Sequence, residues 1–172
     1  LAVERCLVTA LQERFPQDAF LAEESGAAPS TNPYLWIIDP IDGTTNFGNG
    51  LPHFCISVAL QYDGDTVYGS ILDPVKQHHF EAQLSLGAWL NSKPIQVTHT
   101  EELINALLAT GFSYDRRERM DNNVAEFDHL LRKCRGIRRM GAIDVDRRAI
   151  RVPRYQFDPA AHSFKFRQSA NS

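Results

Sequence analysis

Two carboxylates, Asp39 and Asp42, lie three residues apart in a turn shaped by Pro40 and Gly43. Two negative charges held this close repel each other unless a cation neutralises them, and a hard divalent ion such as Mg²⁺ takes carboxylate and carbonyl oxygens as ligands. Gly43 lets the backbone approach an anion, and the Thr44 hydroxyl could orient a water molecule. Asp-Gly-Thr is also ordinary turn or helix-cap composition, so the spacing alone leaves a metal site and a structural turn both open.

A third carboxylate, that of Glu23, ends a short apolar run over residues 19–23 that predicts a strand. A second apolar run, over residues 34–38, predicts a buried strand that ends abruptly at Asp39 and the following proline. The two apolar runs therefore each end in carboxylates, Glu23 after the first and Asp39 after the second.

The remaining pattern predicts an α+β fold in which a helix packs on a mostly antiparallel sheet. Apolar residues at spacings of three and four predict a helix over residues 1–15. Alternation over residues 53–62, followed by the turn signal Asp63-Gly64, predicts a hairpin whose second strand covers residues 66–72. The other expected elements are a loop over 26–33, two short strands between turns at 73–74 and 91–94, a helix over about 117–132, and a strand over 136–139.

Two finer expectations concern the core and the end of the chain. The alternation in the 53–62 strand places Phe54, Ile56 and Val58 on one face, and we expect these side chains to be core, with Cys55 on the opposite face. Beyond Met140 the sequence shows no convincing period of either kind, so it predicts no element there.

The string at residues 36–47, Trp-Ile-Ile-Asp-Pro-Ile-Asp-Gly-Thr-Thr-Asn-Phe, resembles the signature of the inositol monophosphatase family. This family belongs to the lithium-sensitive, Mg²⁺-dependent phosphatases. The segments Glu23-Glu24-Ser25, Pro52-His53-Phe54 and Arg138-Arg139-Met140-Gly141 match the family as well. The resemblance covers roughly residues 1–141 and implies the layered α/β sandwich of the inositol monophosphatase type.

The resemblance also implies a role for each matching position. The metal ligands would be Glu23, Asp39, the Ile41 carbonyl and Asp42, with Mg²⁺ as the cofactor. For these carboxylates to share metals, the strands over 19–23 and 34–38 must be neighbours, about one strand spacing apart, ~5 Å. The phosphate of the substrate would be bound near Asp42, Gly43, Thr44 and Gly141. Thr44 and Glu23 would take part in catalysis, which is direct attack of a metal-activated water on the phosphorus of an inositol or sugar monophosphate.

The sequence departs from the family pattern in three places. The family has an Asp just before the position of Leu1, where it helps Thr44 activate water. After Gly141 the family usually shows Ser or Thr and then small residues, whereas here the string is Ala-Ile-Asp. The family's Trp-Asp motif, which supplies another metal ligand, is absent, since neither Trp36 nor Trp89 precedes an Asp. We therefore expect the parent protein to be an active phosphatase and this chain alone to bind Mg²⁺ weakly and to be nearly or wholly inactive.

The charge is divided sharply along the chain. Residues 1–131 hold 7 basic and 18 acidic side chains, and residues 132–172 hold 11 basic and 3 acidic ones. Three explanations of the basic end stay open: a truncated or frame-shifted reading, a tail that binds nucleic acid or an acidic partner, and a shortened second domain. The expected division is a metal-binding α+β domain over 1–110, the start of a second α/β domain over 111–141, and an atypical basic tail over 142–172.

The composition, 43% hydrophobic and 23% charged, is that of a folded globular protein. No apolar run approaches the ~20 residues that a membrane span needs, so we expect no membrane partner. Three scattered cysteines, Cys6, Cys55 and Cys134, fit reduced thiols and a cytoplasmic protein. The expected partner is a small phosphomonoester substrate, and a homodimer is compatible with the resemblance. The rival interpretation is an inactive family member that acts as a partner of nucleic acid or of the transcription machinery, as some bacterial relatives do.

Overall fold

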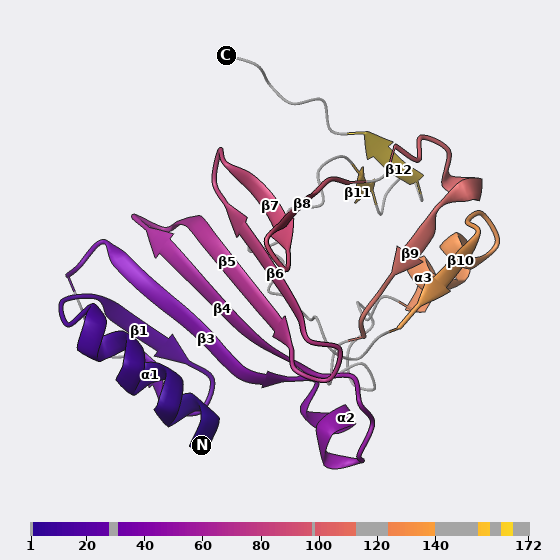
Figure 1. The fold of residues 1–172 in the computed structure, drawn as a ribbon. Helices are drawn as coiled ribbons and strands as arrows, with labels where there is room; N and C mark the ends of the chain where they lie inside the picture. The colour runs from indigo at the N-terminus through magenta and orange to yellow at the C-terminus, as the bar shows by residue number, and fades with distance from the viewer. Residues whose placement is uncertain are drawn as a thin grey trace.

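The structure is a computed structural model that describes residues 2–27, 31–97, 99–112 and 124–139, together with the backbone of 155–158 and 163–166. Its largest sheet has eight strands within the described residues, in the order β2-β1-β3-β4-β5-β6-β7-β8 (Figure 1). These strands are β1 (Ala19–Ala22), β2 (Gly26–Ala27), β3 (Tyr34–Asp42), β4 (Cys55–Tyr62), β5 (Asp65–Asp73), β6 (His78–Gln83), β7 (Gly87–Leu90) and β8 (Lys93–Ile95). Among the described strands of this sheet, only the β1–β3 pair is parallel, so the predicted α+β class with a mostly antiparallel sheet is confirmed.

The predicted N-terminal helix is present as α1 (Ala2–Arg14), and Pro16 follows its end. The helix lies along the β1–β3 side of the sheet (Figure 1). Phe15 packs its ring 5.3 Å from the ring of Trp36, which is 7% exposed. The indole N–H of Trp36 donates to the Asp18 carboxylate at 2.9 Å, so the buried aromatic keeps its polar atom satisfied.

The hairpins follow the turn chemistry of the sequence. Asp63 and Gly64 have φ values of 49° and 85°, and Asn91 and Ser92 have φ values of 48° and 64°. Two consecutive left-handed residues are the geometry that matches the twist of a two-residue hairpin, and Asp-Gly tolerates it well. The predicted turns therefore join β4 to β5 and β7 to β8.

Three expectations about this sheet were wrong. Residues 26–27 are not loop, because they form β2 and pair with β1. Strand β3 does not end at Asp39-Pro40 but continues to Asp42 through an irregular register. The Phe54 face of β4 is only half-buried, whereas Cys55 and Ala59 on the opposite face are 4% and 9% exposed. The deepest core residue is Ile38, at 2% exposure, in the strand that pairs on both sides.

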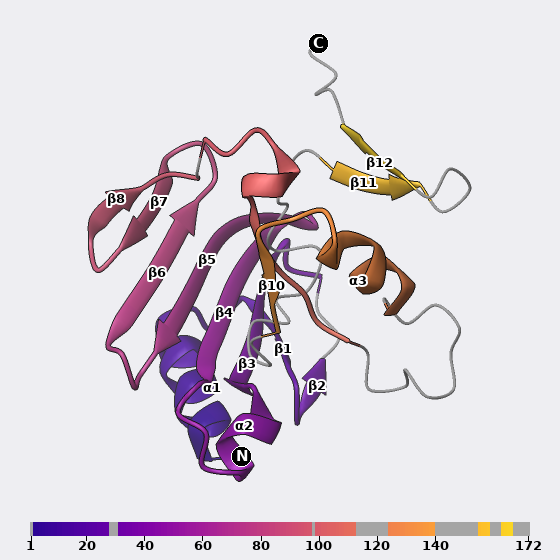
Figure 2. The same ribbon diagram turned by 90° about the vertical axis from the view of Figure 1, so that its right-hand side faces the viewer.

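A second group of elements lies on the opposite side of the sheet from α1 (Figure 2). It contains the 3₁₀ turn η1 (Leu103–Asn105), β9 (Leu107–Ala109), α3 (Val124–Leu131) and β10 (Gly136–Arg138). β10 pairs with β9 in parallel, which confirms the strand predicted near residue 136. The predicted helix over 117–132 is described only as α3, since residues 117–123 lie outside the described residues.

The end of the chain contains one element that the sequence pattern does not predict. β11 (Tyr155–Asp158) and β12 (Ser163–Phe166) pair as an antiparallel hairpin. Within the part of the chain that the structure describes, no helix is long and apolar enough to cross a membrane. The division into domains stays a prediction.

Candidate active site

The parallel pairing of β1 with β3 carries Glu23 to the end of β3. Ala22 pairs with Ile38, and the Glu23 N–H donates to the Ile38 carbonyl at 3.3 Å. This confirms the prediction that the 19–23 and 34–38 strands are neighbours. The buried Glu4 side chain of α1 accepts a hydrogen bond from the Glu24 N–H at 3.0 Å, which fixes the turn that follows β1.

Glu4 is an anchor that the sequence analysis did not identify. Burial acts to raise the pKa of its carboxyl, but hydrogen bonds from the Glu24 N–H and from Ser25 hold that pKa below its ordinary value. The carboxyl therefore stays ionised and keeps accepting the backbone N–H groups of the turn. The position of Glu23 thus depends on both a strand pairing and a helix contact.

A β-bulge in β3 brings Asp39 and Asp42 to the same face of the sheet. Asp39 pairs with Ser57 and Asp42 pairs with Cys55, so three residue steps on β3 match two on β4. Without the extra residue, side chains three apart would point to opposite faces. Pro40 lies inside the bulge, where its missing N–H costs no ladder hydrogen bond.

The three carboxylates influence one another electrostatically. Burial of the Asp39 side chain, and then the negative charges of Glu23 and Asp42, raise the pKa of Asp39 from 3.8 to about 7. The Ile41 N–H donates to the Asp39 carboxylate at 3.1 Å and opposes this rise. A group of carboxylates this crowded favours the binding of a proton or of a cation.

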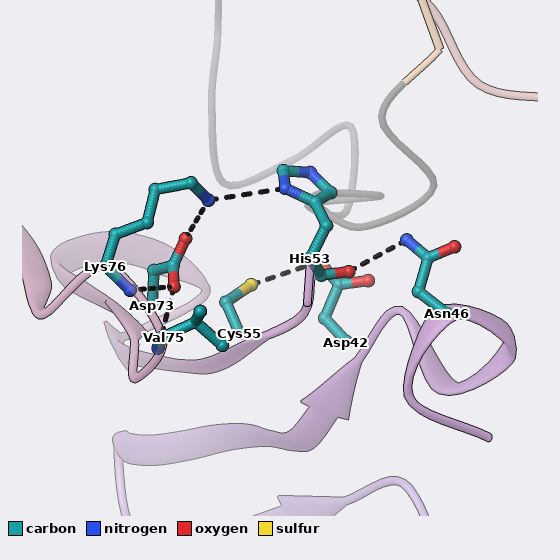
Figure 3. A network of polar contacts seen from close by, with 7 residues as sticks. All are labelled: Asp42, Asn46, His53, Cys55, Asp73, Val75 and Lys76. Atoms are coloured by element: carbon teal, nitrogen blue, oxygen red, sulfur yellow. Dashed lines mark hydrogen bonds and ion pairs between the residues drawn. The ribbon is translucent and has the colours of Figure 1, made fainter. Parts of the chain in front are cut away.

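Asp42 is the most buried of the three carboxylates, at 7% exposure. The Cys55 thiol donates to its Oδ2 oxygen at 3.5 Å (Figure 3). Burial, and then the charge of Asp42, raise the pKa of Cys55 to about 12, so the sulfur keeps its proton and remains a donor. The sequence does not predict this contact, because only the register across the bulge shows that Cys55 faces Asp42.

Gly43 and Thr44 follow the bulge directly. Gly43 is buried and has φ 90° and ψ 36°, a left-handed conformation that favours glycine, and it precedes the short helix α2 (Thr44–Gly48). The Thr44 hydroxyl donates to the Ile41 carbonyl at 3.2 Å. Two of the predicted site atoms, the Thr44 hydroxyl and the Ile41 oxygen, therefore lie side by side.

A polar network continues from the site across the ends of β4 and β5 (Figure 3). The Asn46 amide donates to the His53 carbonyl at 2.8 Å, and the Lys76 ammonium lies 3.5 Å from His53 Nδ1. Lys76 also forms an ion pair with Asp73, at the end of β5. Lys76 is the cation of this network, and nothing in its sequence context singles it out.

A family model described as the inositol monophosphatase family matches residues 1–147. The chain belongs to the inositol monophosphatase family. It is 43% identical over 144 residues to inositol-1-monophosphatase from Synechocystis, an alignment that covers 83% of this chain and 50% of that protein. It is 39% identical over 159 residues to the Nus factor SuhB of Pseudomonas aeruginosa, covering 90% of this chain and 59% of that protein.

The solved structures agree with this family assignment. The structure of inositol monophosphatase from Anabaena matches with a TM-score of 0.78 and 47% identity, over 80% of this chain and 55% of that one. The chain therefore spans between half and three fifths of the length of these family members. The layered family fold expected from the sequence is shown by this similarity.

Two predictions about the site are not tested by the described residues: the phosphate contact of Gly141 and the metal-ligand roles of the carboxylates. Gly141, predicted to bind phosphate, lies outside the described residues. Among the residues that the structure does describe, no group of three His, Cys, Asp or Glu side chains is already arranged to hold a metal ion. Glu23, Asp39 and Asp42 thus interact through their charges, and their roles as ligands stay predictions.

Proposed function

We propose that this chain is part of a cytoplasmic, Mg²⁺-dependent phosphomonoesterase that hydrolyses inositol or sugar monophosphates. The observation that carries the proposal is the crowding of the Asp39 carboxyl by Glu23 and Asp42, which raises its pKa to about 7. The similarity to inositol-1-monophosphatases supports the reaction class. Bound Mg²⁺ would neutralise the carboxylates, activate the attacking water and stabilise the leaving alkoxide.

The donor set fits this ion. Carboxylate oxygens from Glu23, Asp39 and Asp42, and the backbone carbonyl of Ile41, are hard ligands of the kind that Mg²⁺ prefers. The thiol of Cys55 would stay outside the ligand shell, because its raised pKa keeps it protonated and it already donates to Asp42. It would instead hold Asp42 in place for the metal.

The residues after the bulge would bind and orient the substrate. The backbone N–H groups of Gly43 and Thr44 would donate to phosphate oxygens, with Gly141 as a further contact. The Thr44 hydroxyl donates to the Ile41 carbonyl in this structure. In the reaction it would form a hydrogen bond with the attacking water and hold that water in line with the phosphorus. Lys76, whose ammonium lies 3.5 Å from His53 Nδ1, would add a positive charge that favours the approach of an anionic substrate.

The test measures phosphate release from inositol and glycerol phosphates, with Mg²⁺ and with EDTA, for the parent protein and for this chain. The parent protein should be active only with Mg²⁺, and Asp42→Asn should lower kcat by on the order of 10²–10⁴. Asp65→Asn, an exposed charge removal at the start of β5, should leave the rate unchanged. Activity that survives Asp42→Asn would exclude the site.

This chain alone should be nearly or wholly inactive, because residues 1–172 contain no Trp-Asp motif, which the resemblance implies would supply another ligand of the Asp42 metal. Calorimetry should then detect at most one weak Mg²⁺ site, formed by Glu23, Asp39 and Ile41, with millimolar affinity. Two tight sites per chain would contradict this and would mean that residues 142–172 supply a ligand.

A second candidate function rests on similarity to several bacterial relatives that are named Nus factor SuhB. In this alternative the chain keeps the fold and acts as a binding partner of nucleic acid or of the transcription machinery. The basic segment 132–172 favours an anionic partner. Fluorescence anisotropy with labelled RNA across a salt series tests this second function. RNA binding through the basic segment should be measurable and should weaken steeply as the salt concentration rises, and absence of RNA binding would contradict it.

A further inference from the structure

Four polar side chains form a continuous chain of contacts on one face of β5 and β6. The Ser70 Oγ atom lies 2.9 Å from Nε2 of His79. The other ring nitrogen, Nδ1, lies 3.5 Å from Oε2 of Glu81. The remaining Glu81 oxygen, Oε1, accepts a hydrogen bond from the Tyr68 hydroxyl at 2.9 Å. The contacts therefore run from Ser70 to His79, from His79 to Glu81, and from Glu81 to Tyr68.

The contacts favour one of the two tautomers of the neutral His79 ring. A carboxylate accepts hydrogen bonds and cannot donate them, so Nδ1 next to Glu81 is the protonated nitrogen of the neutral ring. In that tautomer the Nε2 lone pair faces the Ser70 hydroxyl at 2.9 Å and can accept its proton. Burial and the bond to Glu81 raise the pKa of Tyr68, and a hydrogen bond with the Ser70 hydroxyl opposes this rise. Tyr68 therefore stays protonated, keeps Glu81 in place and also contacts Ser70.

This cluster is separate from the carboxylate site. Ser70 pairs with Glu81 on β6 and with Val58 on β4, so these side chains share a face. Asp39 pairs with Ser57, which lies on the other face of β4. The ring of His79 is 41% exposed and the Glu81 side chain 31%, so a small molecule can reach them.

The surroundings of the cluster are partly apolar and partly open. Leu72 is the cross-strand neighbour of His79 and is 37% exposed, and Val58 lies on the other side of Ser70. Phe15, which follows α1, packs against Trp36 on this same face, and α1 itself lies along β1 and β3, at a distance from β6 (Figures 1 and 2). An apolar group placed over Leu72 and Val58 would therefore be beside the Ser70 oxygen.

We propose that Ser70 is a nucleophile, with His79 as its general base and Glu81 as the group that orients the base. Its substrates would be activated esters with a short apolar acyl group. The Ser70 oxygen forms a bond to the acyl carbon, the bond from that carbon to the leaving oxygen breaks, and the Ser70 proton moves to His79 Nε2. The leaving oxygen departs with the electron pair, and the imidazolium then gives it the proton.

Turnover should be slow, because the described strands around Ser70 offer no oxyanion hole. Ser70 lies in the interior of a strand that is paired on both edges, so the neighbouring backbone N–H groups are used in the sheet. The donors that stabilise an acyl-transfer transition state are therefore not available beside Ser70. The ester of Ser70 should accumulate, and product should appear as a burst of about one equivalent.

The experiment exposes the full chain to p-nitrophenyl butyrate and, separately, to a fluorescent fluorophosphonate, which loses fluoride in the same substitution. Peptide mass spectrometry should place one adduct per chain on Ser70. Ser70→Ala should abolish the adduct, and His79→Gln should slow its formation by on the order of 10². Glu81→Gln should cause a smaller loss, because its oxygen is 3.5 Å from the ring.

The matched control is Ser57→Ala, which removes a serine from the opposite face of β4 and should leave labelling unchanged. Circular dichroism checks that every variant is folded. A further variant, Ser70→Cys, should react with iodoacetamide faster than the exposed Cys6 of the same chain, because His79 would activate the new thiol. Absence of an adduct on Ser70 in the folded protein, or labelling of His79→Gln within twofold of the unchanged chain, would overturn the proposal.

Discussion

Replacing Asp39 by Asn should make the metal-free chain more stable at pH 8 and leave its stability unchanged near pH 4. The substitution removes one of three crowded negative charges with almost no change of shape. A pKa that rises from 3.8 in the unfolded chain to about 7 in the fold corresponds to ~4 kcal/mol between the two protonation states. The Asp39 side chain is half-buried, and solvent screening reduces this to ~1–2 kcal/mol.

The direction follows from proton binding. The folded chain binds the Asp39 proton more tightly than the unfolded chain does, so this carboxyl favours the fold most below pH 4. That contribution is lost as the pH rises through about 7. Asn does not titrate, so the variant should exceed the unchanged chain in free energy of unfolding by ~1–2 kcal/mol only at the alkaline end.

The assay is urea denaturation in EDTA, followed by far-UV circular dichroism, at several pH values between 4 and 8. Asp65→Asn, an exposed charge removal in the same sheet, should show no such pH-dependent difference. In a parallel series with Mg²⁺, the unchanged chain should gain stability at pH 8 and Asp39→Asn should gain less. An Asp39→Asn variant that is less stable than the unchanged chain at pH 8 would refute the reasoning about crowded carboxylates.

Three other substitutions test how the site is held. Ile38→Ala removes the most buried side chain and should lower the free energy of unfolding by ~2–5 kcal/mol in urea; a loss below ~1 kcal/mol would contradict its place in the core. Gly43→Ala puts a side chain at φ 90° and should lower the free energy of unfolding by ~1–2 kcal/mol. The matched control is Gly64→Ala, at φ 85° in an exposed hairpin, which should show a similar loss of stability. Only the Gly43 variant should also weaken Mg²⁺ binding, measured by calorimetry. Trp36→Phe keeps the ring but removes the 2.9 Å hydrogen bond to Asp18, and thermal and urea unfolding should show a loss of ~1 kcal/mol, whereas no loss would mean that water replaces the bond fully.

Much of the fold could be predicted because local chemistry determines it. The spacing of apolar residues in α1 and the Asp63-Gly64 turn are signals that the sequence carries within a few residues. The pairing of β1 with β3 was predicted for a different reason: the metal-ligand roles that the family resemblance implies for Glu23 and Asp39 required it. Both kinds of prediction are confirmed by the pairing of the strands.

The rest depended on partners that lie far along the chain. Pro40 suggests the end of a strand, and only the register of β4 shows that the strand continues through a bulge. The same register places Cys55 against Asp42. The burial of one face of β4 rather than the other depends on which elements cover the sheet, so the alternation of Phe54, Ile56 and Val58 could not decide it.

The bulge in β3 explains why the motif has three residue steps between its aspartates rather than two. A regular strand would also place two carboxylates on one face with a spacing of two, but its backbone oxygens would be used by the neighbouring strand. Pro40 and Ile41 have no partner on β4, and the Ile41 oxygen is reached by the Thr44 hydroxyl instead. Four consecutive residues thus offer side-chain oxygens at both ends and a main-chain oxygen between them. The irregular pairing thus frees the Ile41 carbonyl oxygen from the sheet, so that it can act as a metal ligand. The sheet hydrogen bonds given up are ones that Pro40, which has no N–H, could not have completed.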